Sequence, residues 1–232
     1  MGKITIKHFL NVNLKPYIIN KQNYYTIYLL ITANRKTTKL KSLIFDEYYT
    51  EDDFNNIFNS NDKEDKLMID NEISSINIIS ELILSELKEF NTTFLTAYIN
   101  FSNTISIWKA DTELYLSEKS LFRKGNFLGV ELDSIYSYIT NHTMQNEVTI
   151  FEFYNYENQK RIIEYLRSKK IKNPKDLLAD INKIIFYTSL EFFEWYIEGS
   201  KKNSDLKNRY FILFDNYKEL IKTYLDEKYI KK

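Results

Sequence analysis

The sequence predicts an α+β fold, in which a small antiparallel three-stranded sheet at the N-terminus is followed by a long helix and a mainly α-helical domain. Two observations predict this fold. β-forming residues occur in short runs up to Phe45, and apolar residues recur at helical spacings beyond residue 60. The 232 residues include 4 Gly and 2 Pro, so few positions interrupt regular structure. We expect a basic β-rich domain over residues 1–60 and a mainly helical domain over residues 61–232.

The three strands are expected within the first 45 residues. Alternating apolar and polar residues predict a strand over residues 3–11, and residues 11–23 predict a loop or an irregular hairpin. The run YYTIYLLITA at residues 24–33 is the clearest strand, because it is rich in β-branched and aromatic residues. The Asn-Arg-Lys sequence at residues 34–36 predicts a turn, and residues 37–45 predict the strand that returns from it.

Helical patterns begin at residue 50. Thr50 and Asp53 form an acidic variant of the capping box, which predicts a short helix through Phe58. A long helix is expected over residues 63–90, because its apolar residues share one face. These residues are Ile69, Ile73, Ile76, Ile83, Leu87 and Phe90. Later parts of the chain or a partner must bury this face, so the sequence leaves a homodimer open.

The second half of the chain is expected to be mainly helical. Residues 91–102 fit a short helix capped by Thr92, and residues 105–108 fit a short strand instead. Residues 148–153 fit either a strand or the start of a helix. Further helices are predicted over residues 112–122, 131–141, 155–170, 174–198 and 204–229. Two of the 4 Gly lie within residues 123–129, the best candidate boundary in this half.

Charged residues are distributed unevenly, although the net charge of the chain is zero. Residues 1–45 contain eight basic and no acidic residues, whereas residues 46–90 contain 13 acidic and three basic residues. Such asymmetry is typical of a basic segment that meets a polyanion. The alternative is that the basic sheet docks on the acidic helix of its own chain, and the two interpretations are compatible.

Aromatic residues make up 16% of the chain, with 19 Tyr and 16 Phe. One interpretation is a surface on which nucleic-acid bases stack. The other is an AT-rich genome, which raises the content of Phe, Tyr, Ile, Asn and Lys together. We favour the second interpretation, because the aromatic residues are spread along the chain.

Four features follow one another closely in the N-terminal quarter of the chain. A strand of the form Y-x-I-Y-L-x-I-T spans residues 25–32, an N-R-K turn follows at residues 34–36, a second strand spans residues 39–45, and an "ED-aromatic" helix start lies at residues 50–54. This stretch resembles the arm-type DNA-binding domain of tyrosine recombinases from Bacteroidetes-like mobile elements. The small sheet of that family contacts DNA, and basic residues on a β-ribbon can enter the major groove. The resemblance implies that the contact candidates are Arg35, Lys36, Thr37, Thr38, Lys39 and Lys41.

The rest of the chain departs from that family. A tyrosine recombinase needs a catalytic domain with several Arg, a His-x-x-Arg element and a Tyr nucleophile. Neither His8 nor His142 is followed by Arg at the third position, and the whole chain contains five Arg. Recombinase activity is therefore not expected, and no enzyme active site is predicted.

No cofactor and no metal site is expected either. The chain has no Cys and two His, and it lacks His-Glu-x-x-His and glycine-rich phosphate motifs. The acidic residues 51–53 fit the N-terminus of a helix better than a cation site. No signal peptide or membrane span is predicted, so we expect a cytoplasmic protein without a membrane partner.

These patterns lead us to expect a non-enzymatic DNA-binding accessory protein of a mobile element or phage, which contacts duplex DNA through its basic hairpin. The alternative is a protein-binding module, such as an inhibitor or an assembly factor of a nucleoprotein or host defence complex. A third hypothesis is a hydrolase or nuclease whose site the sequence does not reveal. Steeply salt-dependent binding of nucleic acid would distinguish the first hypothesis from the other two.

Overall fold

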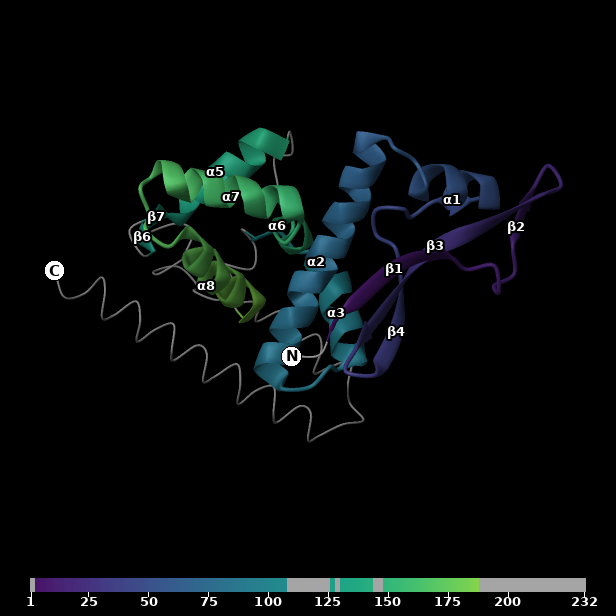
Figure 1. The fold of residues 1–232 in the computed structure, drawn as a ribbon, viewed down its shortest axis with the longest axis horizontal. Helices are drawn as coiled ribbons and strands as arrows, with labels where there is room; N and C mark the ends of the chain where they lie inside the picture. The colour runs from purple at the N-terminus through teal and green to yellow at the C-terminus, as the bar shows by residue number, and fades with distance from the viewer. Residues whose placement is uncertain (1–2, 108–125, 128–129, 144–147, 188–232) are drawn as a thin grey trace. The chain divides into compact units, whose positions relative to one another are not determined.

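The computed structural model describes residues 3–107, 126–127, 130–143 and 148–187. The chain divides into two compact units, the first made of residues 1–99 and 154–157 and the second of residues 100–153 and 158–232. The fold is mixed α+β, and the main sheet belongs to the first unit (Figure 1). The boundary that we expect at residue 60 lies inside this first unit.

Strand β3, Gln22–Ala33, is the centre of the sheet, and the other four strands each pair with it in antiparallel orientation (Figure 1). These strands are β1 Thr5–Leu10, β2 Tyr17–Ile19, β4 Lys36–Lys41 and β5 Tyr48–Tyr49. The three predicted strands are thus confirmed as β1, β3 and β4. The short strand β2 forms within the segment predicted as a loop or irregular hairpin, and β5 is a strand that the sequence patterns did not indicate.

The strand that returns from the β3–β4 turn is shorter than predicted, since it ends at Lys41 and not at residue 45. The backbone N–H groups of Leu43 and Ile44 donate hydrogen bonds to the carboxylate of Glu72 and not to a neighbouring strand. The apolar pattern of residues 43–45 favoured a strand, but this tertiary contact overrides the local preference.

The first unit contains α1 Glu51–Phe58, α2 Lys63–Leu87 and most of α3 Thr92–Ser102. The predicted capping box opens α1. Helix α2 ends earlier than predicted, because Lys88 adopts a left-handed backbone conformation with a φ of 59°. For residues 91–102 the helical alternative is confirmed. Its cap is Asn91 and not Thr92, because the Asn91 side chain accepts the N–H of Phe94 at 2.9 Å.

The apolar core of the first unit combines one face of the sheet with one face of α2. The side chains of Ile27, Leu29 and Ile31 in β3 are fully buried. Helix α2, which packs against β1, contributes three further fully buried side chains, Ile76, Ile79 and Ile83. Burial of a large aliphatic side chain contributes about 1.5–3 kcal/mol, so these residues supply much of the stability of the unit.

A buried carboxylate joins α2 to the sheet. Glu72 is fully buried, and its Oε2 atom lies 2.7 Å from Nε2 of His8 in β1 and accepts the hydroxyl of Ser42 at 2.7 Å. Its Oε1 atom accepts the backbone N–H groups of Leu43 at 2.6 Å and Ile44 at 3.3 Å. Because an ionised carboxylate only accepts hydrogen bonds, these four groups offset the cost of burying it.

The described part of the second unit is mainly helical. Its elements are β6 Asn126–Phe127, β7 Val130–Glu131, α5 Leu132–Thr143, α6 Ile150–Phe153, α7 Tyr156–Ser168, which begins in the first unit, and α8 Pro174–Tyr187. The buried side chains of Gln159 and Asn182 join α7 to α8 through reciprocal amide hydrogen bonds of 3.3 and 3.2 Å. Because both amides are satisfied, they fix the register of the two helices without leaving a buried polar group unpaired.

Several predictions for the second half are confirmed. The helices predicted over residues 131–141 and 155–170 form as α5 and α7, and their observed bounds differ from the predicted ones by one or two residues. Helix α8 starts at Pro174 as expected. Within residues 148–153, Thr149 forms an isolated β-bridge with Ser106, and Ile150–Phe153 form the short helix α6. The helices predicted over residues 112–122 and 204–229, the C-terminal end of the helix predicted over 174–198, and most of the candidate boundary lie outside the described residues.

Replacing Glu72 tests how far the first unit depends on this carboxylate. Glu72→Ala leaves His8, Ser42 and two backbone N–H groups without their acceptor, so we expect it to lower the free energy of unfolding by about 3–5 kcal/mol. Urea denaturation followed by circular dichroism measures this loss. The control is Glu81→Ala on the exposed side of the same helix, expected to change stability by less than about 0.5 kcal/mol. Equal effects of the two substitutions would contradict this role of Glu72.

The capping box of α1 predicts a pH-dependent contribution to stability. Hydrogen bonds from the side chain and then the backbone of Thr50 lower the pKa of Asp53 below its usual 3.8. A lowered carboxyl pKa adds stability above the usual value and loses it as the pH falls through the folded-state pKa. We expect Thr50→Ala to cost about 1 kcal/mol at pH 7 and less at pH 3 in urea denaturation. An undiminished cost at pH 3 would show that the ionised Asp53 carboxylate does not contribute.

Candidate nucleic-acid interface

Strand β4 divides the predicted contact residues between the two faces of the sheet. Successive side chains of a strand point to opposite faces. Leu40 is buried, and Lys36 and Thr38 lie on the same side of the strand as Leu40. The other predicted residues of this strand lie on the opposite side: Thr37, Lys39 and Lys41.

The register extends this second set across the sheet to β3 and β1. We call the resulting set of nine side chains the outer face. Its three rows are Thr5–Thr32–Thr37, Lys7–Leu30–Lys39 and Phe9–Tyr28–Lys41, each row giving the residues of β1, β3 and β4 in that order. The outer face therefore combines three ammonium groups, three threonine hydroxyls and the aromatic rings of Phe9 and Tyr28, without a carboxylate.

Contacts within the outer face order its side chains. The hydroxyls of Thr32 and Thr37 lie 3.0 Å apart. The Nζ atom of Lys39 lies 5.3 Å from the centroid of the Phe9 ring, within the range of a cation–π contact. The Phe9 and Tyr28 rings have centroids 6.1 Å apart. Ordered side chains lose less conformational entropy when a ligand binds, which favours this face as a binding surface.

The positive charge of the N-terminal segment is not neutralised by ion pairs of the described residues. The Lys and Arg side chains of residues 3–45 form no ion pair with a carboxylate in the part of the chain that the structure describes. Among the described residues, the buried side chains of His8 and Glu72 connect the basic segment to the acidic one. The ammonium groups of the outer face thus have no carboxylate partner among the described residues, although Nζ of Lys41 donates a hydrogen bond to the backbone carbonyl of Asp46 at 3.1 Å.

Arg35, Lys36 and Thr38 lie apart from the outer face. Arg35 is exposed in the two-residue β3–β4 turn, and Lys36 is exposed at the first position of β4. Thr38 is half-buried and pairs with Ile31, whose side chain is in the core. Arg35 therefore borders the outer face at the turn, whereas Lys36 and Thr38 lie on the core side of the sheet.

The sequence patterns did not indicate the residues that β1 and β3 contribute to the outer face. The most important of these are Lys7, Phe9 and Tyr28. The alternation within each strand was a signal for them, because Lys7 and Phe9 flank the inward-facing His8. Their position beside Lys39 and Lys41 depends on the register, which pattern alone does not specify.

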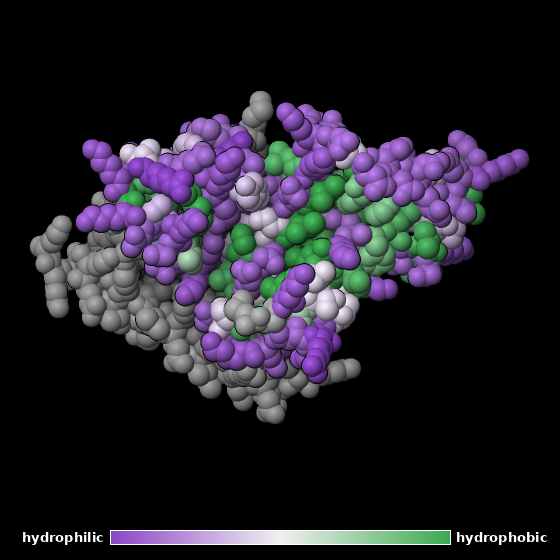
Figure 2. All heavy atoms as spheres, in the orientation of Figure 1, coloured by the Kyte–Doolittle hydropathy of each residue, from purple (hydrophilic) through white to green (hydrophobic). Residues whose placement is uncertain are grey.

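The basic surface ends near strand β5. Asp46 and Glu47 are exposed immediately before this strand. Burial raises the pKa of the half-buried Tyr49 hydroxyl, and the carboxylates of Glu47, Asp46 and Asp53 raise it further. Tyr49 is therefore a neutral phenol at pH 7. Toward the β2 end of the sheet, hydrophobic residues also show at the surface in Figure 2.

Other kinds of site find little support among the described residues. None of them form a group of three or more His, Asp or Glu side chains that could hold a metal ion. Glu51, Asp52 and Asp53 lie in the first turn of α1, where the helix dipole stabilises negative charge. Within the same ranges, no helix is long and apolar enough to cross a membrane.

Comparisons of the chain with protein-family models, with curated proteins and with solved structures find no match. The resemblance of residues 24–58 to arm-type DNA-binding domains therefore stays a prediction. The choice of a partner rests on the chemistry of the outer face.

The β3–β4 turn offers a direct test of the hairpin geometry. Asn34 and Arg35 have φ values of 48° and 64°, as a two-residue turn with positive φ at both positions requires. Glycine adopts this conformation without the steric cost of a side chain, so Arg35→Gly should raise the free energy of unfolding by about 0.5 kcal/mol. Lys36→Gly, in the extended strand, should lower it. Urea denaturation of both variants measures the difference, and destabilisation by Arg35→Gly would contradict the turn.

Proposed function

We propose that this protein binds duplex DNA through the outer face of its sheet, with Arg35 in the β3–β4 turn as a flanking contact. The observation that supports the proposal most strongly is the acid-free face on which Lys7, Lys39 and Lys41 lie together. Lysine ammonium groups neutralise phosphates and release counterions, the main source of affinity for DNA.

The dimensions of the sheet fit the major groove. Lys7 in β1 and Lys39 in β4 lie on either side of Leu30 in the central strand β3. Two strand spacings separate them, so their backbones lie about 10 Å apart. The major groove is about 12 Å wide and admits a β-ribbon. The two lysines can therefore reach phosphates on opposite walls of the groove. Between them, Leu30 and the Thr hydroxyls face the base edges, where they can contact thymine methyl groups and hydrogen-bonding atoms.

The packing of the sheet against α2 favours a rigid DNA-binding surface. The opposite face of the sheet is fixed to α2 by the apolar core and by the Glu72 hydrogen bonds. A surface held in place in this way presents its side chains in one arrangement, which lowers the entropic cost of binding. The expected accessory role in a mobile element or phage is part of this proposal, and it follows from the resemblance to arm-type domains.

Salt-dependent binding of duplex DNA tests the proposal. We expect wild-type protein to bind a fluorescein-labelled blunt duplex in anisotropy titrations, with an affinity that falls steeply as salt rises. The triple variant Lys7→Ala, Lys39→Ala, Lys41→Ala should bind at least roughly tenfold more weakly. Its slope of log K against log salt should be smaller by about 2 to 3, because each phosphate contact contributes about 0.9.

A matched variant controls for the loss of net charge. The control carries Lys63→Ala, Lys66→Ala and Lys88→Ala on and beside α2, where all three side chains are exposed. It changes the net charge equally and should keep most of the affinity and the slope. Absence of wild-type binding at low salt would refute the proposal, as would equal losses in the two triple variants.

A protein partner is the alternative that a specific observation favours. Val12, Leu14, Ile18 and Ile19 are between 42% and 64% exposed, and exposed apolar clusters mark interaction surfaces. Binding to a protein through these residues would depend weakly on salt, so the same titrations separate it from DNA binding.

A further inference from the structure

The side of the sheet that carries the outer face continues beyond it, toward β2 and β5. Along β3, residues 24, 26, 28, 30 and 32 share one side of the strand. Tyr24 pairs with Tyr17 of β2, and Thr26 pairs with Tyr48 of β5. Tyr17, Tyr24 and Tyr48 therefore lie on the same side of the sheet as Tyr28. We call these three residues the tyrosine end.

Two rings of the tyrosine end are stacked on each other and exposed. The centroids of Tyr17 and Tyr48 lie 5.2 Å apart with an angle of 23° between the ring planes. Their exposed fractions are 57% and 54%. They reach each other from two different strands that both pair with β3, so the stack lies over the centre of this part of the sheet. Because both rings are already exposed, they can present a flat aromatic surface to a ligand without any rearrangement of the core.

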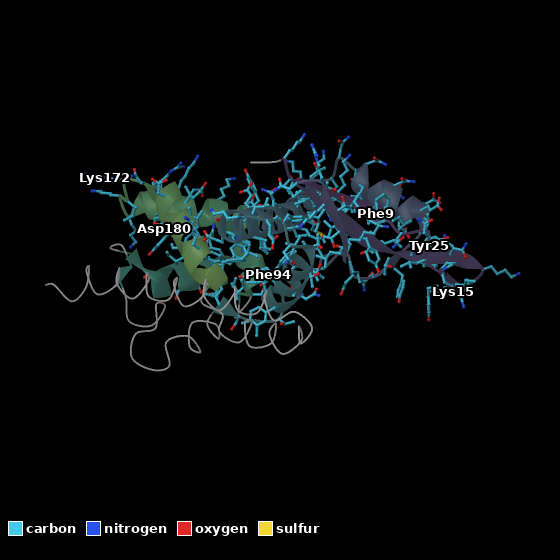
Figure 3. The ribbon with its side chains drawn as sticks, turned by 90° about the horizontal axis from the view of Figure 1, so that it is seen from below. Phe9, Lys15, Tyr25, Phe94, Lys172 and Asp180 are labelled. Carbon is cyan, nitrogen blue, oxygen red and sulfur yellow. The ribbon has the colours of Figure 1, made fainter. Side chains whose placement is uncertain are left out.

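The charges around the tyrosine end differ from those of the outer face. Lys15 and Lys21 are exposed in the segments before β2 and after it, and Figure 3 shows Phe9, Tyr25 and Lys15 in succession toward this end. Asp46 and Glu47 precede Tyr48 and would repel a phosphate placed beside it. A nucleobase carries no charge and stacks on any aromatic face. The surroundings of Tyr48 thus suit a base better than a backbone phosphate.

We propose that the tyrosine end stacks with unpaired bases, so that the ligand of this protein is duplex DNA continued by a single strand. This inference rests on the proposed function. The duplex lies on the outer face, and one strand leaves it along β3 to reach Tyr17 and Tyr48. Leu30 lies six residue steps along β3 from Tyr24, a distance of about 20 Å, which equals the span of a few extended nucleotides. The exposed side chain of Ile18 pairs opposite Asn23, on the other side of β2, and takes no part.

The test compares three kinds of labelled ligand in anisotropy titrations: a blunt duplex, the same duplex with a single-stranded extension of eight thymidines, and the extension alone. The extended duplex is made in two forms, with the extension on the 5′ end or on the 3′ end of one strand. Wild-type protein should prefer one polarity of the extension. It should bind the duplex with that extension roughly tenfold more tightly than the blunt duplex. The variant Tyr17→Ala, Tyr48→Ala should lose this preference and keep its affinity for the blunt duplex. Tyr17→Phe, Tyr48→Phe should retain the preference, because stacking needs the ring and not the hydroxyl.

Two controls make the outcomes unambiguous. Tyr156→Ala removes another exposed tyrosine of the first unit, 52% exposed and outside the sheet, and should behave like wild type. Thermal unfolding checks that each variant is folded. Equal binding of blunt and extended duplexes by wild-type protein would overturn this inference and leave the proposed function intact. Failure to bind any duplex would overturn both, and a preference that survives in the Tyr17→Ala, Tyr48→Ala variant would assign it to other residues.

Discussion

The carboxylate of Glu72 connects the elements on which the rest of the first unit depends. It reaches from helix α2 to His8 in the middle of β1 and to Ser42, Leu43 and Ile44 immediately after β4. One side chain thus fixes β1 and the segment that follows β4 to the helix. A buried charge has a high cost without such partners, and its position is therefore strongly determined by them. The same hydrogen bonds end β4 at Lys41 and direct the chain toward β5.

This constraint relates the interior of the unit to its surface. His8 points inward to Glu72, and its neighbours Lys7 and Phe9 consequently point outward, because side chains alternate along a strand. On β4, the inward position of Leu40 places Lys39 and Lys41 outside in the same way. A one-residue slip of either strand would bury lysine and expose histidine or leucine, at a high cost in free energy. The basic outer face is thus a consequence of how the core and the buried carboxylate set the register.

Much of the fold was predictable from local patterns, whereas the composition of the candidate site was only partly so. Runs of β-formers located β1, β3 and β4, and the Thr50–Asp53 capping box located the start of α1. Glu72 was not recognised as a buried residue, because nothing local distinguishes it from a solvent-exposed glutamate on a helix. The resemblance to arm-type domains included Thr38 among the contact candidates, but the alternation of side chains along β4 turns it toward the core. Lys7 and Phe9 were omitted because their proximity to Lys39 arises from pairing between strands distant in sequence.

We propose that DNA binds to one side of the sheet and to no other basic surface of the first unit. Lysine footprinting tests it most directly: the protein is acetylated with and without saturating duplex DNA, and the modification of each lysine is measured by mass spectrometry. We expect DNA to protect Lys7, Lys39 and Lys41 and to leave Lys63 and Lys66 of α2 as reactive as in the free protein. Protection of the α2 lysines with unchanged reactivity of the three outer-face lysines would contradict it.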